Sequence, residues 1–222
     1  MTNSKPILLF DLDGTLIDSA PDLLETLNVI LKRNGRATLT IEAVKKLVGD
    51  GARALLERGF KETGAPAENL DDLSVEFIET YVPNCAVHSR PFNGVTETLE
   101  AFANDGYRMA VCTNKPQAPS ETILTKLGLI QYFEVVVGGD YFPVRKPNPQ
   151  HLLGALQLMD AEGSPAIMVG DSYNDVASAR NAEMPVIVVT YGYTTTPAKE
   201  LGGDILIDHF SDIIDAVSRL RA

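Results

Sequence analysis

Short apolar runs alternate with longer segments of helical periodicity over the second half of the chain. The runs have the length of buried strands and fall at 108–113, 134–138, 166–170, 186–190 and 205–207. Between them, segments such as 149–159 and 173–182 repeat apolar positions every three or four residues, as helices do. This alternation is typical of parallel strands joined by helices. We therefore predict an α/β fold with a doubly wound parallel sheet.

The first apolar run, at residues 7–10, also predicts a strand buried on both faces. The segment from about residue 18 to 90 differs, because it shows helical patterns and no convincing strand. Helices are expected there at 23–33, 41–48, 52–63 and 70–81. We therefore predict a core formed by residues 1–17 and 92–222, with a small helical cap domain inserted at 18–91.

Composition and charge narrow the class of partner. The 222 residues are 45% apolar, which is enough to build a full core, and the formal net charge is −11. No basic stripe is present, so we expect no nucleic-acid partner. An acidic protein that binds phosphate needs locally concentrated positive charge, and a metal ion would supply it.

Cysteine usage and the N-terminus bear on location. Cys85 and Cys112 form neither a C-x-x-C pair nor a disulfide framework, which fits a reducing compartment. The apolar run at 7–10 is too short for a signal peptide or a membrane span. We therefore expect a cytoplasmic protein, monomeric or homodimeric, that does not bind membranes.

Polar residues follow the predicted strands, at the edge where open parallel sheets bind ligands. They are Asp11-Leu12-Asp13-Gly14-Thr15, Thr113-Asn114-Lys115-Pro116, Lys146-Pro147, and Gly170-Asp171 with Asp175 four residues on. Singly, each has an ordinary explanation as a turn, a helix cap or a surface residue. Those explanations do not account for carboxylate, hydroxyl, amide and lysine groups recurring at successive strand ends.

The aspartates suit phosphoryl transfer through a covalent intermediate. The Asp11 carboxylate can attack phosphorus to form an aspartyl-phosphate. Asp13 can donate a proton to the leaving alkoxide and later accept one from water. Mg²⁺ prefers oxygen ligands, and we expect Asp11, a main-chain carbonyl near Asp13, and Asp171 to bind it.

The remaining residues of the set suit binding of the phosphoryl oxygens. We expect Thr113, the backbone N–H of Asn114 and Lys146 to hold these oxygens and to stabilise their charge. Asp175 lies about one helical turn after Asp171, where it can orient Lys146 or the outer shell of the metal.

With these four motifs in order along nearly the whole chain, the sequence resembles the haloacid dehalogenase superfamily of phosphohydrolases. The resemblance implies a doubly wound sheet with a small cap inserted after the first motif. It also implies that Asp11 is the nucleophile and a metal ligand, that Asp13 is the acid/base and binds metal through its carbonyl, and that Asp171 is the acidic metal ligand. Thr113 and Lys146 would bind phosphate, and we also expect Gly14 of the first motif to contact the substrate.

Five further segments resemble the bacterial phosphoglycolate phosphatases within that superfamily. They lie at 18–23, 48–53, 113–116, 137–140 and 191–193. The resemblance implies hydrolysis of 2-phosphoglycolate to glycolate and phosphate. Related enzymes act on sugar phosphates, amino-sugar phosphates or nucleotides, and a phosphosugar mutase would share every catalytic residue. A receiver-like signalling module is the non-enzyme alternative, but such a module has little need of Asp13 or of a cap.

The cap contains one candidate for recognition of a substrate carboxylate. The turn from Gly49 to Arg53 opens a predicted helix, so its N-terminal amides, Gly51 among them, and the Arg53 side chain could receive the carboxylate. A tight turn with an exposed arginine explains the same residues equally well. Arg58 is a second candidate.

Overall fold

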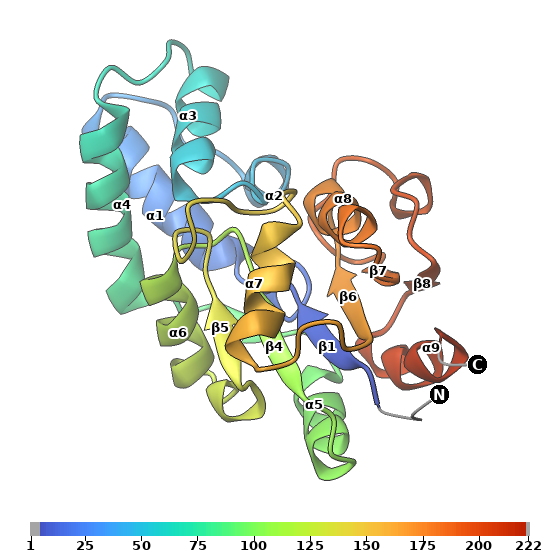
Figure 1. Cartoon of the computed structure of the whole chain (residues 1–222). Coiled ribbons are helices and arrows are strands. Elements are labelled where there is room, and N and C mark those ends of the chain that lie inside the picture. The colour runs from blue at the N-terminus through green and yellow to red at the C-terminus, as the bar shows by residue number, and fades with distance from the viewer. Residues whose placement is uncertain (1–4, 221–222) are drawn as a thin grey trace.

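A six-stranded parallel sheet forms the centre of the protein in the computed structural model, which describes residues 5–220 (Figure 1). Its strands are β1 (Ile7–Phe10), β4 (Met109–Cys112), β5 (Val135–Val137), β6 (Ala166–Gly170), β7 (Val186–Val189) and β8 (Ile205–Ile207). Their order is β5-β4-β1-β6-β7-β8, and each neighbouring pair is parallel. The predicted fold class is confirmed.

Helices cover both faces of this sheet. They are α5 (Val95–Asn104), α6 (Gln117–Lys126) and α9 (Ile213–Leu220) on one face, with α7 (Gln150–Leu158) and α8 (Tyr173–Asn181) on the other. Three short 3₁₀ turns lie in the described chain, at Ile130–Tyr132, Ala198–Glu200 and Phe210–Asp212. Side chains alternate along β1, so that Leu8 and Phe10 enter one core and Ile7 and Leu9 the other. Burial on both faces explains why the strands are continuous apolar runs.

Strand order changes direction beside β1. From β1 the chain continues to β4 and then outward to β5, after which it returns to β6 on the opposite side of β1. Ligands bind outside the carboxyl ends of the strands at such a switch point. The residues that follow β1, β4 and β6 therefore lie where the fold leaves room for a ligand.

Four helices pack together beyond the carboxyl ends of the strands and form the cap (Figure 1). They are α1 (Ala20–Arg33), α2 (Ile41–Lys45), α3 (Ala52–Glu62) and α4 (Leu70–Asn84). Helix α2 is shorter than the predicted 41–48. Gly49 and Gly51, in the loop that follows, have φ values of +119° and +84°, a conformation that favours glycine.

A two-stranded ribbon joins the cap to the core. In it β2 (Ile17–Asp18) pairs antiparallel with β3 (Arg90–Pro91). The sequence predicts no strand here, because two residues are too few to show an alternating pattern. The proposed domain limits at 17/18 and 91/92 fall at this ribbon, and residues 1–4 and 221–222 of the proposed core lie outside the described residues.

The buried carboxylate of Asp22 holds the returning chain against α1. It accepts hydrogen bonds from the N–H of His88 (2.9 and 3.1 Å to its two oxygens) and from the N–H and hydroxyl of Ser89 (2.8 and 2.6 Å). Each donor would lose its partner without the carboxylate, and buried groups left without partners are costly. Asp22 therefore fixes the geometry of the joint between cap and core.

The lengths of the helices and the burial of the two cysteines are further features of the fold. Within residues 5–220, no helix combines the length and the apolar character needed to cross a membrane. Cys85 and Cys112 are buried free thiols, and burial raises the pKa of Cys112 to about 12. Cys112 is therefore a packing residue, not a nucleophile.

Asp22→Ala should lower the free energy of unfolding by about 2–4 kcal/mol, because several buried donors lose a charged acceptor at once. Urea unfolding at pH 7 measures the loss. Glu25→Ala is the matched control on the same helix, because Glu25 makes only an exposed contact with His88, and it should change stability by less than about 0.5 kcal/mol. Equal losses in the two variants would contradict the role given to Asp22.

Candidate active site

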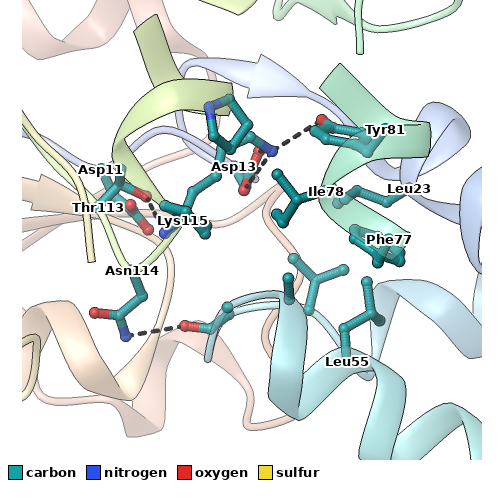
Figure 2. A pocket seen from close by; sticks show the side chains of 16 residues that line it. Asp11, Asp13, Leu23, Leu55, Phe77, Ile78, Tyr81, Thr113, Asn114 and Lys115 are labelled. Atoms are coloured by element: carbon teal, nitrogen blue, oxygen red, sulfur yellow. Dashed lines mark hydrogen bonds and ion pairs between the residues drawn. The ribbon is translucent and has the colours of Figure 1, made fainter. Parts of the chain in front are cut away.

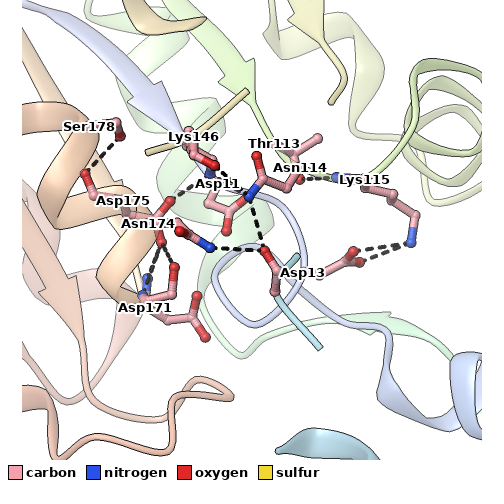
Figure 3. A network of polar contacts seen from close by, with 12 residues as sticks. Asp11, Asp13, Thr113, Asn114, Lys115, Lys146, Asp171, Asn174, Asp175 and Ser178 are labelled. Atoms are coloured by element: carbon pink, nitrogen blue, oxygen red, sulfur yellow. Dashed lines mark hydrogen bonds and ion pairs between the residues drawn. The ribbon is translucent and has the colours of Figure 1, made fainter. Parts of the chain in front are cut away.

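Three carboxylates and one lysine meet at the carboxyl end of the sheet (Figure 3). Asp11 follows β1, Asp171 follows β6, Asp175 lies in the first turn of α8, and Lys146 lies in the loop between β5 and α7. All four residues are buried. One oxygen from each carboxylate lies within 4.8 Å of the other two. The fold thus brings together residues that the sequence analysis assigned to a single site.

Lys146 supplies positive charge to this cluster. Its Nζ lies 2.6 Å from Oδ1 of Asp175 and 2.9 Å from Oδ1 of Asp11, and its side chain is 1% exposed. Burial works to lower the pKa of Lys146, but the two carboxylates raise the pKa above its usual value. The ammonium therefore remains charged at neutral pH.

Asp175 orients its neighbours through both of its carboxylate oxygens. Its Oδ1 accepts from Lys146, and its Oδ2 accepts from the N–H of Asp171 (3.2 Å) and from the N–H and hydroxyl of Ser172 (3.0 and 2.7 Å). The contact with Ser172 also caps the start of α8. Asp175 therefore fixes both Lys146 and the loop that carries Asp171.

Negative charge exceeds positive charge among these four groups. Burial, together with repulsion by Asp175, raises the pKa of Asp11 to about 6, against the opposing effect of Lys146. Burial and the charges of Asp175 and Asp11 raise the pKa of Asp171 well above its usual value. The cluster in its fully ionised state therefore requires further positive charge.

The carboxylates fit a divalent cation. Oδ1 of Asp11 is buried and accepts no hydrogen bond among the described residues, since the nearby Lys146 ammonium lies outside hydrogen-bond geometry. Asp171 accepts from the N–H of Tyr193 at Oδ2, and no hydrogen bond to its other oxygen is found in the described chain. Carboxylate oxygens of this kind are the ligands that Mg²⁺ prefers. Asp11 and Asp171 are therefore the two side chains best placed to hold it.

The loop after β4 brings donors to the same place. The N–H of Thr113 continues the sheet by donating to the carbonyl of Val137 (3.0 Å), and its buried hydroxyl lies beside the pocket that contains Asp11. The side-chain amide of Asn114 donates to the carbonyls of Gly49 and Lys146 (both 3.1 Å). The side-chain amide of Asn114 therefore joins three loops. The backbone N–H of Asn114 remains the group that we expect to contact phosphate.

Gly14 provides space at the site. Its φ is +83°, and an added Cβ would lie 2.5 Å from Oδ2 of Asp171. Its N–H donates to the carbonyl of Ile17 (3.0 Å) within the turn after β1. This N–H is thus engaged within the protein, and Gly14 serves the site by allowing Asp171 to approach β1.

Asp13 is held by side chains that the sequence analysis did not single out. Ser19 donates to its Oδ1 (2.5 Å), and Nζ of Lys115 lies 3.1 and 3.2 Å from its two oxygens. Lys115 also donates to the hydroxyl of Tyr81 on α4 (2.8 Å), so that the cap contacts Asp13 through this lysine (Figure 2). Lys115 stands in the segment that follows β4, so its position in the sequence marks it as a candidate site residue. No local pattern connects position 81 with position 13.

The segment after β7 anchors Asp171. The N–H of Tyr193 donates to Oδ2 of Asp171 (2.6 Å), and an added Cβ at Gly192 would overlap Asp171. The Tyr193 hydroxyl donates to Asp18 and accepts from the N–H of Ala20 (3.0 Å). Residues 192–193 therefore tie the Asp171 loop to the first residues of the cap.

The cap loop between α2 and α3 rests on the core. The carbonyl of Gly49 accepts from the side-chain amides of Asn114 (3.1 Å) and Asn174 (3.3 Å). The Asn174 amide also donates to Asp50 (2.7 Å). These contacts place the cap over the carboxylates, in a closed arrangement.

An enclosed pocket lies between the cap and the catalytic edge (Figure 2). Asp11, Asp13 and Thr113 form its floor, while apolar side chains of α1, α3 and α4 line its walls; they are Leu23, Ala52, Leu55, Phe77 and Ile78. Its volume is about 30 Å³, against about 310 Å³ for the neighbouring pocket beside Asp171. The enclosed pocket is therefore the smaller of the two, and Asp13 lines both.

Neither of the two arginines considered for substrate recognition lines the enclosed pocket. Arg53 forms an exposed ion pair with Asp71 and does not line the enclosed pocket, although Gly51 does. Arg58 donates to the carbonyl of Leu47 (2.9 Å) and pairs with Asp50, which stabilises the cap loop, and it faces the larger pocket. The helix-opening turn is thus at the site, but the Arg53 side chain is not.

Sequence comparison identifies relatives of similar length. A model of the haloacid dehalogenase-like hydrolase family matches residues 8–189. A phosphoglycolate phosphatase from Agrobacterium fabrum is 42% identical over 215 residues, which cover 96% of this chain and 92% of the relative. Another from Caulobacter vibrioides is 43% identical over 208 residues, which cover 93% and 88%.

Structural comparison agrees with the sequence comparison. A crystal structure described as a predicted phosphoglycolate phosphatase from Haemophilus somnus superposes with a TM-score of 0.89 at 32% identity. The superposition covers 97% of this chain and 99% of that one. Sheet and cap are therefore arranged alike in the two proteins.

The raised pKa values predict how stability depends on pH and metal. A carboxyl whose pKa is higher in the folded than in the unfolded protein contributes stability at low pH and loses it as pH rises through the folded value. The metal-free protein should therefore become less stable as pH rises from about 4 to above about 6, and Mg²⁺ should restore stability at pH 8. Thermal unfolding at pH 5 and pH 8, with chelator or with Mg²⁺, measures both effects.

Asp171→Asn should stabilise the metal-free protein at pH 8 by on the order of 1–3 kcal/mol, or roughly 2–10 °C in Tm, because it removes one of the repelling charges. The same variant should gain much less from Mg²⁺ than the wild type. Asp215→Asn, at an exposed position on α9, is the control and should behave as the wild type does. A metal-free Asp171→Asn protein less stable than the wild type at pH 8 would contradict the charge argument.

Proposed function

The chain belongs to the haloacid dehalogenase-like hydrolases and is a phosphatase, and we propose that it hydrolyses 2-phosphoglycolate to glycolate and phosphate with the aid of Mg²⁺. The observation that supports the proposal is that Asp11, Asp13 and Thr113 line one small pocket, and that Nζ of Lys146 lies 2.9 Å from Asp11. The identity of 42–43% to two phosphoglycolate phosphatases supports the choice of substrate.

The first step forms a covalent intermediate. A carboxylate oxygen of Asp11 attacks phosphorus, and the bond between phosphorus and the ester oxygen breaks. Asp13 gives a proton to the departing glycolate oxygen. Ser19 and Lys115 hold Asp13 in place for this transfer. The products of this step are glycolate and an aspartyl-phosphate.

The second step returns the nucleophile to its starting state. Asp13, now ionised, accepts a proton from water as the water oxygen attacks phosphorus, and the bond to Asp11 breaks. Thr113 and Lys146 stabilise the phosphoryl oxygens in both steps. When bound by Asp11, Asp171 and the carbonyl of Asp13, Mg²⁺ would supply the charge that offsets repulsion between the aspartates and the phosphate dianion.

The size of the enclosed pocket supports a small leaving group. Glycolate adds two carbons beyond the ester oxygen, whereas sugars and nucleosides are several times larger. The apolar walls formed by Leu55, Phe77 and Ile78 would exclude those larger groups while the cap is closed. Among the alternatives named from the sequence, sugar phosphates and nucleotides would require the cap to open further.

The covalent step predicts distinct behaviour for the two aspartates. Asp11→Asn should lose at least about 10⁴-fold in kcat without unfolding, because a neutral amide is a poor nucleophile. Asp13→Asn should slow turnover and allow the phosphorylated enzyme to accumulate. Mass spectrometry after brief exposure to substrate should find the added phosphate on Asp11. Phosphate on Ser172 or His151 would show the mechanism to be wrong.

A substrate panel tests the assigned reaction. With Mg²⁺, kcat/KM should be highest for 2-phosphoglycolate and at least about 10-fold lower for glucose 6-phosphate, glucosamine 6-phosphate and nucleoside monophosphates, which exceed the enclosed pocket. Measuring released phosphate and residual phosphate ester separates hydrolysis from mutase activity. Preference for a sugar phosphate, or isomerisation without phosphate release, would overturn the proposal.

A further inference from the structure

Lys115 is the one cationic side chain among the residues that line the enclosed pocket. Its side chain is 4% exposed, and its Nζ contacts Asp13 and the hydroxyl of Tyr81. The Nζ also lies 4.4 Å from the centre of the Tyr81 ring. The remaining wall on the cap side is apolar, so an anionic group in this pocket has Lys115 as its charged partner.

We propose that Lys115 recognises the carboxylate of the substrate and thereby selects 2-phosphoglycolate over uncharged phosphate esters of the same size. This inference rests on the proposed function and names the residue that determines its specificity. Lys115 thus takes the role first considered for Arg53, whose guanidinium pairs with Asp71 outside the enclosed pocket.

The distance between the reacting atoms and Lys115 suits a two-carbon acid. Asp13 must hydrogen-bond the ester oxygen to protonate it, and Nζ of Lys115 lies 3.1–3.2 Å from the Asp13 oxygens. The carboxylate carbon of 2-phosphoglycolate is two bonds from that ester oxygen. A leaving group bound at Asp13 therefore places its carboxylate next to Lys115.

The surroundings strengthen such a contact. The apolar side chains of Phe77, Ile78 and Leu55 line the same pocket as Lys115, and a charge pair interacts more strongly in surroundings of low polarity. The first turn of α3, which opens at Gly51 and Ala52 beside the pocket, has N–H groups without partners inside the helix. These N–H groups can donate to the same carboxylate from the cap side.

Lys115 could alternatively act only by positioning Asp13. That role would affect every substrate alike, because all of them need the same proton. Recognition of the carboxylate would instead affect only substrates that carry one. The two roles are therefore separated by comparing 2-phosphoglycolate with ethyl phosphate, in which a methyl group replaces the carboxylate.

The experiment measures kcat/KM on both esters for the wild type, Lys115→Met and Lys115→Gln. Met keeps much of the length of the lysine side chain but carries no charge. Gln keeps a hydrogen-bond donor toward Asp13, and it provides a second neutral variant if Met disturbs folding. Both variants should lose on the order of 10- to 150-fold more on 2-phosphoglycolate than on ethyl phosphate. Inhibition by glycolate should weaken by a similar factor, while inhibition by inorganic phosphate should change little.

Arg53→Ala is the control, since it removes a cap cation that lies outside the enclosed pocket, and it should leave the ratio between the two esters unchanged. Equal losses on both esters in the Lys115 variants would overturn the inference while the proposed function stands. A selective loss in Arg53→Ala would overturn it too and move recognition to the cap helix. A wild type without preference for 2-phosphoglycolate would instead refute the proposed substrate, and the role of Lys115 with it.

Discussion

The buried ammonium of Lys146, held between Asp11 and Asp175, is the contact on which the arrangement of the site depends. It comes from the β5–α7 loop and meets carboxylates that follow β1 and begin α8, so it joins segments from both sides of the point where the strand order switches. Removing one partner of such a group would leave a buried charge uncompensated, which is strongly destabilising. The loops that carry the proposed catalytic residues are therefore held together by the ion pairs of Lys146.

Burying three carboxylates beside one lysine lowers the stability of the protein, and the proposed function gives a reason for it. Three carboxylates share a single lysine in a buried space, and burial together with the repulsion that remains raises the pKa of Asp11 and of Asp171. A protein selected for stability alone would place neutral groups there. The excess negative charge instead suits the divalent cation of the proposed function.

The cap joins the site through polar contacts at its edge and apolar contacts at its centre. Asn114 and Asn174 hold the cap loop at Gly49, while Tyr81 reaches Lys115 and, through it, Asp13. The cap thus completes the surroundings of Asp13, the proposed acid/base, and leaves a small pocket between itself and the core.

The sequence alone predicted the fold class, which the structure confirms, and it located the polar residues that follow the strands. It could do so because apolar runs and helical periodicity are local, and because parallel strands bring their carboxyl ends to one edge. The limits of core and cap remain a prediction. Tertiary packing alone shows that Arg53 pairs with Asp71 outside the enclosed pocket, that Ser19 and Lys115 contact Asp13, and that Tyr81 contacts Lys115. These facts depend on how the cap packs against the core, and no local pattern encodes a contact between residues 81 and 115 or the direction in which a side chain of α3 points.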